Sequence, residues 1–226
     1  MATQTNQDHF SGGLAKILAE NWQVDVRLKA VDSDEGLVIS AHKVIQASRS
    51  AVLKKMLESD EFKTSAKQVG TITLLEMKQE ELEAFVEFLY SDGSMLSSKV
   101  KQHARALYRA ADKYEILRLR ELCRSELISS LNSTNSLNLL ELAQIPFDKV
   151  LNDAALSYIK TNELMFPSFD EFKLFVDNYP NLAVEVMMAS LTRTPSTSCS
   201  RCGLITYHNQ TGTSCCSCGF DYPRRS

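Results

Sequence analysis

Glycine and proline are scarce in this chain of 226 residues, which contains only 8 glycines and 5 prolines. Average usage would be about twice as high. No glycine occurs between Gly93 and Gly203. Because glycine favours turns and weakens helices, a stretch this long without it predicts helices joined by short connections.

The chain also lacks a long apolar run, a secretory leader and a strong net charge. No run approaches the roughly 18 consecutive apolar residues that a membrane-spanning helix needs. Residues 1–7 have neither the basic nor the apolar region of a signal peptide. The 25 basic and 28 acidic residues give a net charge of -3, which disfavours general nucleic-acid binding. We expect an intracellular protein, cytoplasmic or nuclear, with reduced thiols and no membrane partner.

Sequence motifs of catalysis are missing as well. There is no glycine-rich phosphate-binding loop and no nucleophile elbow. The four histidines are scattered along the chain, at positions 9, 42, 103 and 208. The sequence therefore predicts no catalytic residue, and we expect a protein that is not an enzyme.

Apolar residues make up 44% of the chain, which is enough for a substantial core. Apolar and polar residues alternate over 24–28, which predicts a half-buried strand. A turn at 32–36 and the apolar run 37–39 predict a second strand that forms a hairpin with the first. Residues 71–75 predict a third strand.

Helical spacing of apolar residues dominates the rest of the chain. After a polar leader that ends at Gly13, Leu14, Ile17 and Leu18 form a short apolar stripe, and Ser50 stands where it would cap a later helix. The other expected core positions are Val44, Ile45, Val52, Leu53, Met56, Leu57, Leu82, Phe85, Val86, Leu89, Ala104, Leu107, Tyr108, Ala111, Tyr114, Leu119, Leu122, Cys123, Leu127 and Leu131. Since strands are confined to the first third, we expect an α+β fold, a small mixed sheet packed against a helical cluster.

A polar stretch at 132–136 predicts a domain boundary near the middle of the chain. Apolar faces at helical spacing continue beyond it, and Pro146, Pro167 and Pro180 fall between them, where proline ends helices. We expect a helical extension of three to five elements over residues 132–192, followed by a linker at 192–198.

Five of the six cysteines lie in the last 28 residues. They include two Cys-x-x-Cys pairs, each followed by glycine, with twelve residues between the pairs. Each such turn points two sulfurs at one metal, and two turns complete a tetrahedral site of four thiolates. The spacing predicts a structural zinc ribbon over 199–220, in which residues 204–207 supply one strand. The predicted ligands are Cys199, Cys202, Cys215 and Cys218, while Cys216 is spare.

Two other interpretations of the cysteine-rich tail stay open. Disulfides are disfavoured by a reducing compartment, and a redox dithiol would need a strand–helix context that this tail lacks.

The tail carries four arginines but no basic stripe, so contact with nucleic acid is less favoured than contact with protein.

Several segments together resemble the signature of the BTB/POZ family over residues 14–131. They are Asp25-Val26, the run from Ala41 to Ser50, Met56-Leu57, residues 72–74, Phe85 to Gly93, residues 110–114, Leu119 and Cys123. The following helices resemble the 3-box and the start of a BACK domain, and the combination with a four-cysteine tail is similar to short plant BTB/POZ proteins. His42 in this signature is expected to be a buried, hydrogen-bonded histidine rather than a metal ligand.

The resemblance implies a non-enzymatic homodimer that acts by binding other proteins. It places Leu14, Ile17 and Leu18 in the dimer interface, and it matches Asp25 and Lys43 to a groove at that interface. A purely structural ion pair between Asp25 and Lys43 is the alternative. A short helix at Leu14 is unstable alone, so its apolar stripe has to pack on something.

The resemblance also implies an adaptor of cullin-3 ubiquitin ligases, with an unidentified substrate protein as a further partner. Family members contact the cullin through a hydrophobic-x-Glu motif, for which Phe62 supplies the hydrophobic residue while Thr64 replaces the acid. The alternative function is a dimeric transcriptional or assembly scaffold whose zinc tail contacts nucleic acid or chromatin proteins.

Overall fold

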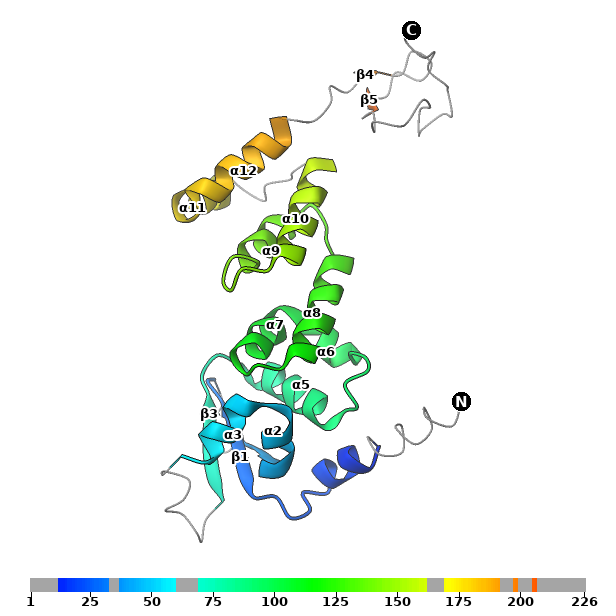
Figure 1. The fold of residues 1–226 in the computed structure, drawn as a ribbon, viewed down its shortest axis with the longest axis vertical. Coiled ribbons are helices and arrows are strands. Elements are labelled where there is room, and N and C mark those ends of the chain that lie inside the picture. Colours follow the sequence, from blue (N-terminus) through cyan, green and yellow to red (C-terminus); the bar gives the residue numbers. More distant parts are fainter. Residues whose placement is uncertain are drawn as a thin grey trace, which may run out of the picture. The chain divides into compact units, whose positions relative to one another are not determined.

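The computed structural model describes residues 12–32, 37–59, 69–161, 169–191, 197–198 and 205–206. The chain divides into two compact units, residues 1–130 and 131–226 (Figure 1). In the first unit a helical segment at 12–19 is followed by β1 (Val26–Ala30), β2 (Ile39–Ala41), α2 (Lys43–Arg49), α3 (Ala51–Leu57), β3 (Gly70–Leu74), α5 (Gln79–Tyr90), α6 (Ser98–Gln102), α7 (Ala104–Lys113) and α8 (Leu117–Ser129).

The described strands of the first unit form a mixed sheet in the order β2-β1-β3. β1 pairs antiparallel with β2 and parallel with β3. Val26, Leu28 and Ala30 are fully buried, so β1 has the period of two that its sequence predicts. β2 begins two residues later than expected, because the antiparallel pairing brings Ala41 opposite Val26 and leaves Leu37 outside the strand.

Ser50 separates two short helices and joins them to the helical cluster. Its hydroxyl oxygen accepts a hydrogen bond from the Leu53 N–H at 3.0 Å, which makes it the N-cap of α3, as predicted. The same hydroxyl donates to the carbonyl oxygen of Tyr114 at 2.6 Å. This buried serine therefore fixes α3 against the chain that follows α7.

The interpretation of Val44 as a core residue is wrong, because 71% of it is exposed. α2 instead buries Gln46, at 1% exposed. The two positions lie about 200° apart around a helix, so only one of them can face the core. The prediction of a leader through Gly13 also needs correction, since Gly12 and Gly13 belong to the helical segment 12–19.

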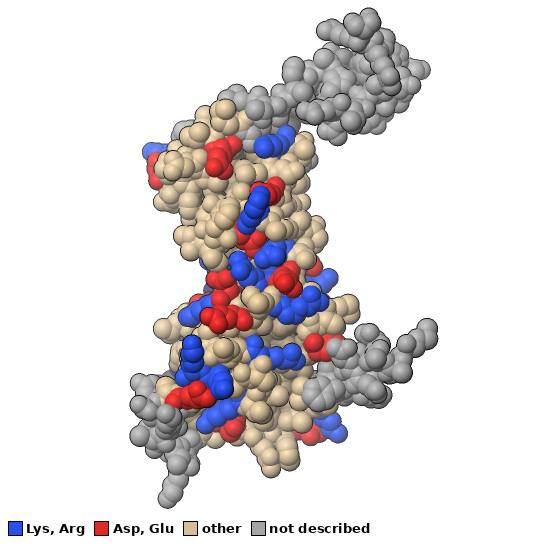
Figure 2. Space-filling model, in the orientation of Figure 1, with Lys and Arg blue, Asp and Glu red and all other residues tan. Residues whose placement is uncertain are grey.

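The helices α5, α7 and α8 form the larger part of the first core. The expected apolar faces of α5 and α7 are buried throughout, from Leu82 to Leu89 and from Ala104 to Tyr114. Acidic and basic side chains are interspersed on the face of this unit that Figure 2 shows. The ion pairs of this unit include Lys99–Glu83 at 2.6 Å and Arg120–Asp112 at 3.4 Å.

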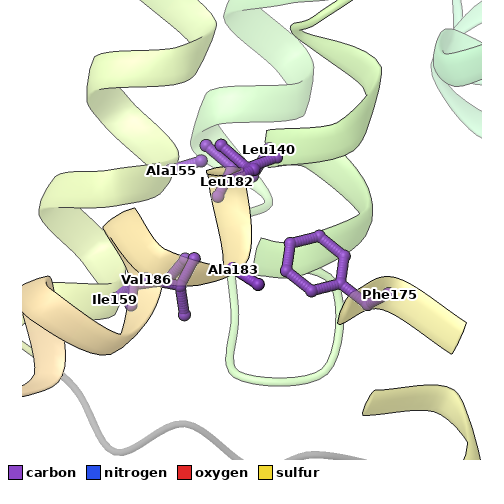
Figure 3. Close-up of a cluster of buried hydrophobic side chains, with 7 residues drawn as sticks. All are labelled: Leu140, Ala155, Ile159, Phe175, Leu182, Ala183 and Val186. Atoms are coloured by element: carbon purple, nitrogen blue, oxygen red, sulfur yellow. The ribbon is translucent and has the colours of Figure 1, made fainter. Parts of the chain in front are cut away.

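The second unit contains α9 (Ser136–Leu142), α10 (Lys149–Thr161), α11 (Phe169–Asn178) and α12 (Pro180–Leu191). Side chains from all four helices meet in one apolar core (Figure 3). This core consists of Leu140, Ala155, Ile159, Phe175, Leu182, Ala183 and Val186. Tyr179 donates its hydroxyl proton to a Glu141 carboxylate oxygen at 2.9 Å and so ties the start of α12 to α9.

A two-stranded antiparallel pair follows the helices of the second unit. β4 (Thr197–Ser198) pairs with β5 (Ile205–Thr206), so that Thr197 lies opposite Thr206. The strand predicted at 204–207 is therefore present over its two central residues. Across the described part of the chain, no helix has the length and apolar character needed to cross a bilayer.

Candidate functional site

The helical segment 12–19 presents an apolar side that the rest of its own chain only partly covers. Leu14, Ile17 and Leu18 share this side, and all three are intermediate in burial. Trp22, just beyond the segment, is 57% exposed. The chain turns there through two non-glycine residues with positive φ, Asn21 at 49° and Gln23 at 54°. Large apolar groups left half-covered in this way are typical of a surface that meets another protein.

A cavity of about 380 Å³ lies between this segment, β2 and α5. Its apolar lining includes Leu18, Ile39, Val86 and Tyr90. The charged residues Glu83, Glu87 and Lys99 also line this cavity. A second hollow of about 470 Å³ is lined by Leu18, by residues 37–38 before β2, and by Ile39 and Ser40 of β2. The helical segment is therefore loosely packed against its own domain.

The hydrogen bond from Lys99 to Glu83 places a charged pair at the cavity. Lys99 Nζ lies 2.6 Å from Glu83 Oε2. This bond and a second one from Gln79 hold the pKa of the Glu83 carboxyl below its usual value of 4.5, against a smaller opposing effect of burial. The pair offsets the charge of Glu83, and the carboxylate of Glu87 leaves the cavity wall with a net negative charge.

His42 and Tyr90 form a closed hydrogen-bond network beneath this surface. The backbone N–H of His42 donates to the Tyr90 hydroxyl oxygen at 2.9 Å, and the same oxygen lies 2.6 Å from His42 Nδ1. His42 Nε2 lies 2.7 Å from the carbonyl oxygen of Trp22. Since a carbonyl only accepts, Nε2 carries the proton, and Nδ1 accepts the Tyr90 hydroxyl proton.

This network confirms the prediction that His42 is buried and hydrogen-bonded. Both ring nitrogens have partners, so neither is left to coordinate a metal. Burial raises the pKa of Tyr90 to about 12, the hydrogen bond from His42 opposes this shift, and the charge of Asp25 adds to it. The network links α5, the start of α2 and the turn that carries Trp22, and so positions the helical segment 12–19.

Asp25 and Lys43 lie close together in the structure, and their predicted place in a groove at a dimer interface stays a prediction. The contact is between the Asp25 carboxylate and the backbone of Lys43, whose N–H donates to Asp25 Oδ1 at 2.7 Å. Asp25 is exposed, and its own N–H donates to the Ala41 carbonyl oxygen at 3.1 Å. Asp25 therefore fastens the end of β2 to the first turn of α2.

Arg49 joins two segments of the BTB/POZ signature, the run from Ala41 to Ser50 and the run from Phe85 to Gly93. Its guanidinium donates to the carbonyl oxygen of Leu89 at 3.1 Å and to that of Ser91. These carbonyls lie at the carboxyl end of α5, where acceptors have no partner within the helix. Arg49 thereby fixes α2 to the end of α5.

The carboxylate of Glu76, whose side chain is 26% exposed, connects the end of β3 with α7. Lys113 Nζ donates to Glu76 Oε2 at 2.7 Å, and the Tyr114 hydroxyl donates to the other oxygen. Burial raises the pKa of Glu76, but the hydrogen bonds from Lys113 and Tyr114 outweigh it, so the pKa lies below 4.5. Burial and the neighbouring carboxylate raise the pKa of the Tyr114 hydroxyl.

Two sets of predicted site residues lie outside the described residues. They are Phe62 and Thr64 of the cullin motif, and the four predicted zinc ligands Cys199, Cys202, Cys215 and Cys218. The β4–β5 pair encloses the first Cys-x-x-Cys segment in sequence. The sixth cysteine, Cys123, is fully buried in α8, and burial raises its pKa to about 12, so it does not compete for metal.

Comparison with known proteins identifies the first unit. The family model described as the BTB/POZ domain matches residues 15–131. The chain belongs to the BTB/POZ family. BTB/POZ domains are protein–protein interaction modules, so binding of other proteins is the general function of this chain.

Two relatives from Arabidopsis thaliana are similar to this chain both within the matched domain and beyond it. BTB/POZ domain-containing protein At2g05330 is 88% identical over 226 residues, which cover 100% of both chains. BTB/POZ domain-containing protein At5g48510 is 68% identical over 218 residues, which cover 96% of each chain. Among solved structures, the BTB domain of zebrafish PATZ1 has a TM-score of 0.42 and 15% identity, over 57% of this chain and 95% of that one.

Sequence reasoning missed several residues of this site. Tyr90, Glu76 and Arg49 all contact groups that lie 38 to 48 residues away in the chain. Tyr90 belongs to the motif that ends at Gly93, but nothing in its local pattern identifies His42 as its partner. The one signal in the sequence is that a buried tyrosine needs a hydrogen-bond partner for its hydroxyl, which predicts a polar contact for Tyr90 but not its partner.

Proposed function

We propose that this BTB/POZ protein is a non-enzymatic homodimeric adaptor that brings a client protein to a cullin-3 ubiquitin ligase. The observation that carries the proposal is membership of the BTB/POZ family together with the half-covered apolar side of the helical segment 12–19. Family resemblance supports cullin-3 as the ligase partner and Phe62 as the residue that contacts it.

The dimer part of the proposal is supported by packing. A helix of about two turns is marginal by itself in water, and its stability has to come from burial of an apolar face. Leu14, Ile17 and Leu18 are only partly buried within one chain, and Leu18 lines a cavity of about 380 Å³. A second copy that packs on this face would complete the burial, and two-fold symmetry would place both copies of the segment in one interface.

A quantitative cullin-3 binding measurement tests the adaptor function. We expect full-length protein to bind cullin-3, and Phe62→Ala to weaken binding at least about tenfold, as loss of an interface anchor does. Met95→Ala is the matched control, because Met95 is an apolar residue 75% exposed in the same unit and outside the motif. Thr64→Glu restores the acid of the family motif and is expected to strengthen binding. Absence of binding by all forms would contradict the proposal.

The cysteine-rich tail is proposed to hold one structural zinc ion through Cys199, Cys202, Cys215 and Cys218. Four thiolates at this spacing are a donor set that suits tetrahedral zinc and leave no position open for a reacting ligand. When bound, the ion would order the tail, because structural zinc sites stabilise their fold by about 10–16 kcal/mol.

Metal analysis of the purified full chain tests the zinc site. We expect about one zinc per chain, loss of that zinc in Cys199→Ser/Cys202→Ser, and retention in the control Cys216→Ser. Zinc content that is unchanged in the double variant would exclude this ligand set.

A further inference from the structure

Helix α12 is apolar on two sides, but the core of the second unit covers only one of them. The buried side consists of Leu182, Ala183 and Val186, none more than 7% exposed. On the other side Val184, Met187 and Met188 are 59%, 53% and 55% exposed. These three residues follow the i, i+3, i+4 spacing, so their side chains lie next to one another. We call them the α12 stripe.

Such a stripe is unusual on a helix that remains in water. Amphipathic surface helices place charged or polar residues opposite the core, and a helix apolar all round is normally covered on both sides. Glu185 is the one charged residue of α12. The two methionines add adaptability, because their unbranched thioether side chains can repack against different partners. The stripe therefore has the composition of a binding surface.

The charge around the α12 stripe indicates the sign of the charge that its partner carries. Residues 131–191 contain eight acidic residues, three lysines and no arginine, a net charge of -5, whereas the whole chain carries -3. Glu185 lies three residues before Met188 and so borders the stripe on the same helix. Asp170 and Asp177 of α11 are exposed beside Lys173, and Asp153 of α10 is exposed beside Lys149 and Lys160. In Figure 2 most of the surface over the extension helices is formed by uncharged residues.

We propose that the α12 stripe binds an amphipathic, basic helix of a partner protein. A helix that presents apolar residues at the same spacing can pack along the stripe by ridges into grooves, with lysines or arginines facing the surrounding carboxylates. A second copy of this chain is a poorer occupant, because two acidic surfaces would repel each other. The inference rests on the proposed adaptor function and names the class of client that the extension recruits.

Two synthetic peptides of about 18 residues test the stripe in the full-length protein. One has leucines at the i, i+3, i+4, i+7 positions and lysines elsewhere, and the other has glutamates in place of the lysines. Fluorescence anisotropy with labelled peptide measures each affinity. We expect the basic peptide to bind at least about tenfold more tightly than the acidic one. Met187→Ser/Met188→Ser should weaken the basic peptide at least about tenfold, since it removes two anchors.

Two further variants make the test specific. Ile145→Ser is the matched control, because Ile145 is 79% exposed in the same unit but lies outside α12, and its binding should equal that of the wild type. Glu185→Lys should weaken the basic peptide and strengthen the acidic one. Thermal unfolding of each variant checks the fold, which should hold because every substituted side chain is exposed.

Three outcomes would overturn the inference: no binding of either peptide, equal binding by wild type and double methionine variant, or loss of dimer mass in that variant. The last would make a second copy the occupant of the stripe. Cullin-3 binding is measured on the same variants and is expected to stay unchanged. If cullin-3 binding is unchanged while neither peptide binds, the proposed adaptor function stands and only the role of the α12 stripe as a binding surface is refuted.

Discussion

At the scale of single residues, the most consequential contact is the hydroxyl of Tyr90. It is a partner of both the backbone N–H and the Nδ1 atom of His42, and Tyr90 itself is only 2% exposed. Tyr90→Phe would leave two buried polar groups without a partner, at a cost of about 1–3 kcal/mol in the free energy of unfolding. Denaturant unfolding measures this loss.

Tyr108→Phe is the control for that experiment. Tyr108 is fully buried like Tyr90, and its hydroxyl lies 3.5 Å from Arg120 Nη2, outside the His42 network. We expect a smaller loss of stability for this variant, because it leaves both His42 groups with their Tyr90 partner. A loss at Tyr90→Phe no larger than at Tyr108→Phe would show that the His42 network contributes little.

Glu76 makes the free energy of unfolding depend on pH in the acidic range. Because its pKa in the folded protein is below the usual 4.5, its stabilising contribution is fully present above that pH and is lost as the pH falls through the folded value. Glu76→Gln should therefore flatten the fall in unfolding free energy between about pH 5 and pH 3. Glu121→Gln, which changes a carboxylate 59% exposed, is the control. Equal slopes for wild type and Glu76→Gln would contradict the assignment.

At the scale of elements, helical faces could be predicted from sequence and tertiary pairing could not. The buried positions of α5 and α7 follow the 3.6-residue period, which depends on local spacing alone. The parallel pairing of β1 with β3 joins segments that begin 44 residues apart, and an alternating pattern does not encode direction. Val44 shows the limit of the method, because in α2, a helix of seven residues, tertiary packing and not the apolar pattern selects the buried face, which carries Gln46.

The helical segment 12–19 carries the element-scale prediction. Leu14→Ser/Leu18→Ser removes two of the apolar side chains expected at the dimer interface, so sedimentation velocity should report a shift from dimer to monomer at micromolar concentration. Lys16→Ser is the matched control, since the Lys16 side chain is 72% exposed on the same segment. The shift should be absent in the control. A dimer that survives the double leucine variant would place the interface elsewhere.

At the scale of the whole molecule, a BTB/POZ domain, a helical second unit and a cysteine-rich tail form one chain of 25.3 kDa. We propose self-association and ligase contact for the first unit, and client contact for the second. The order of motifs was enough to indicate the family from sequence. The site required the structure, because the contacts of His42, Glu76 and Arg49 bridge distant segments.

The most direct test of this account is the mass of the complex that full-length protein forms with cullin-3, measured by light scattering after size-exclusion chromatography. We expect a mass equal to two adaptor chains and two cullin-3 chains. Separate elution of cullin-3 and of a single 25.3 kDa chain would contradict it.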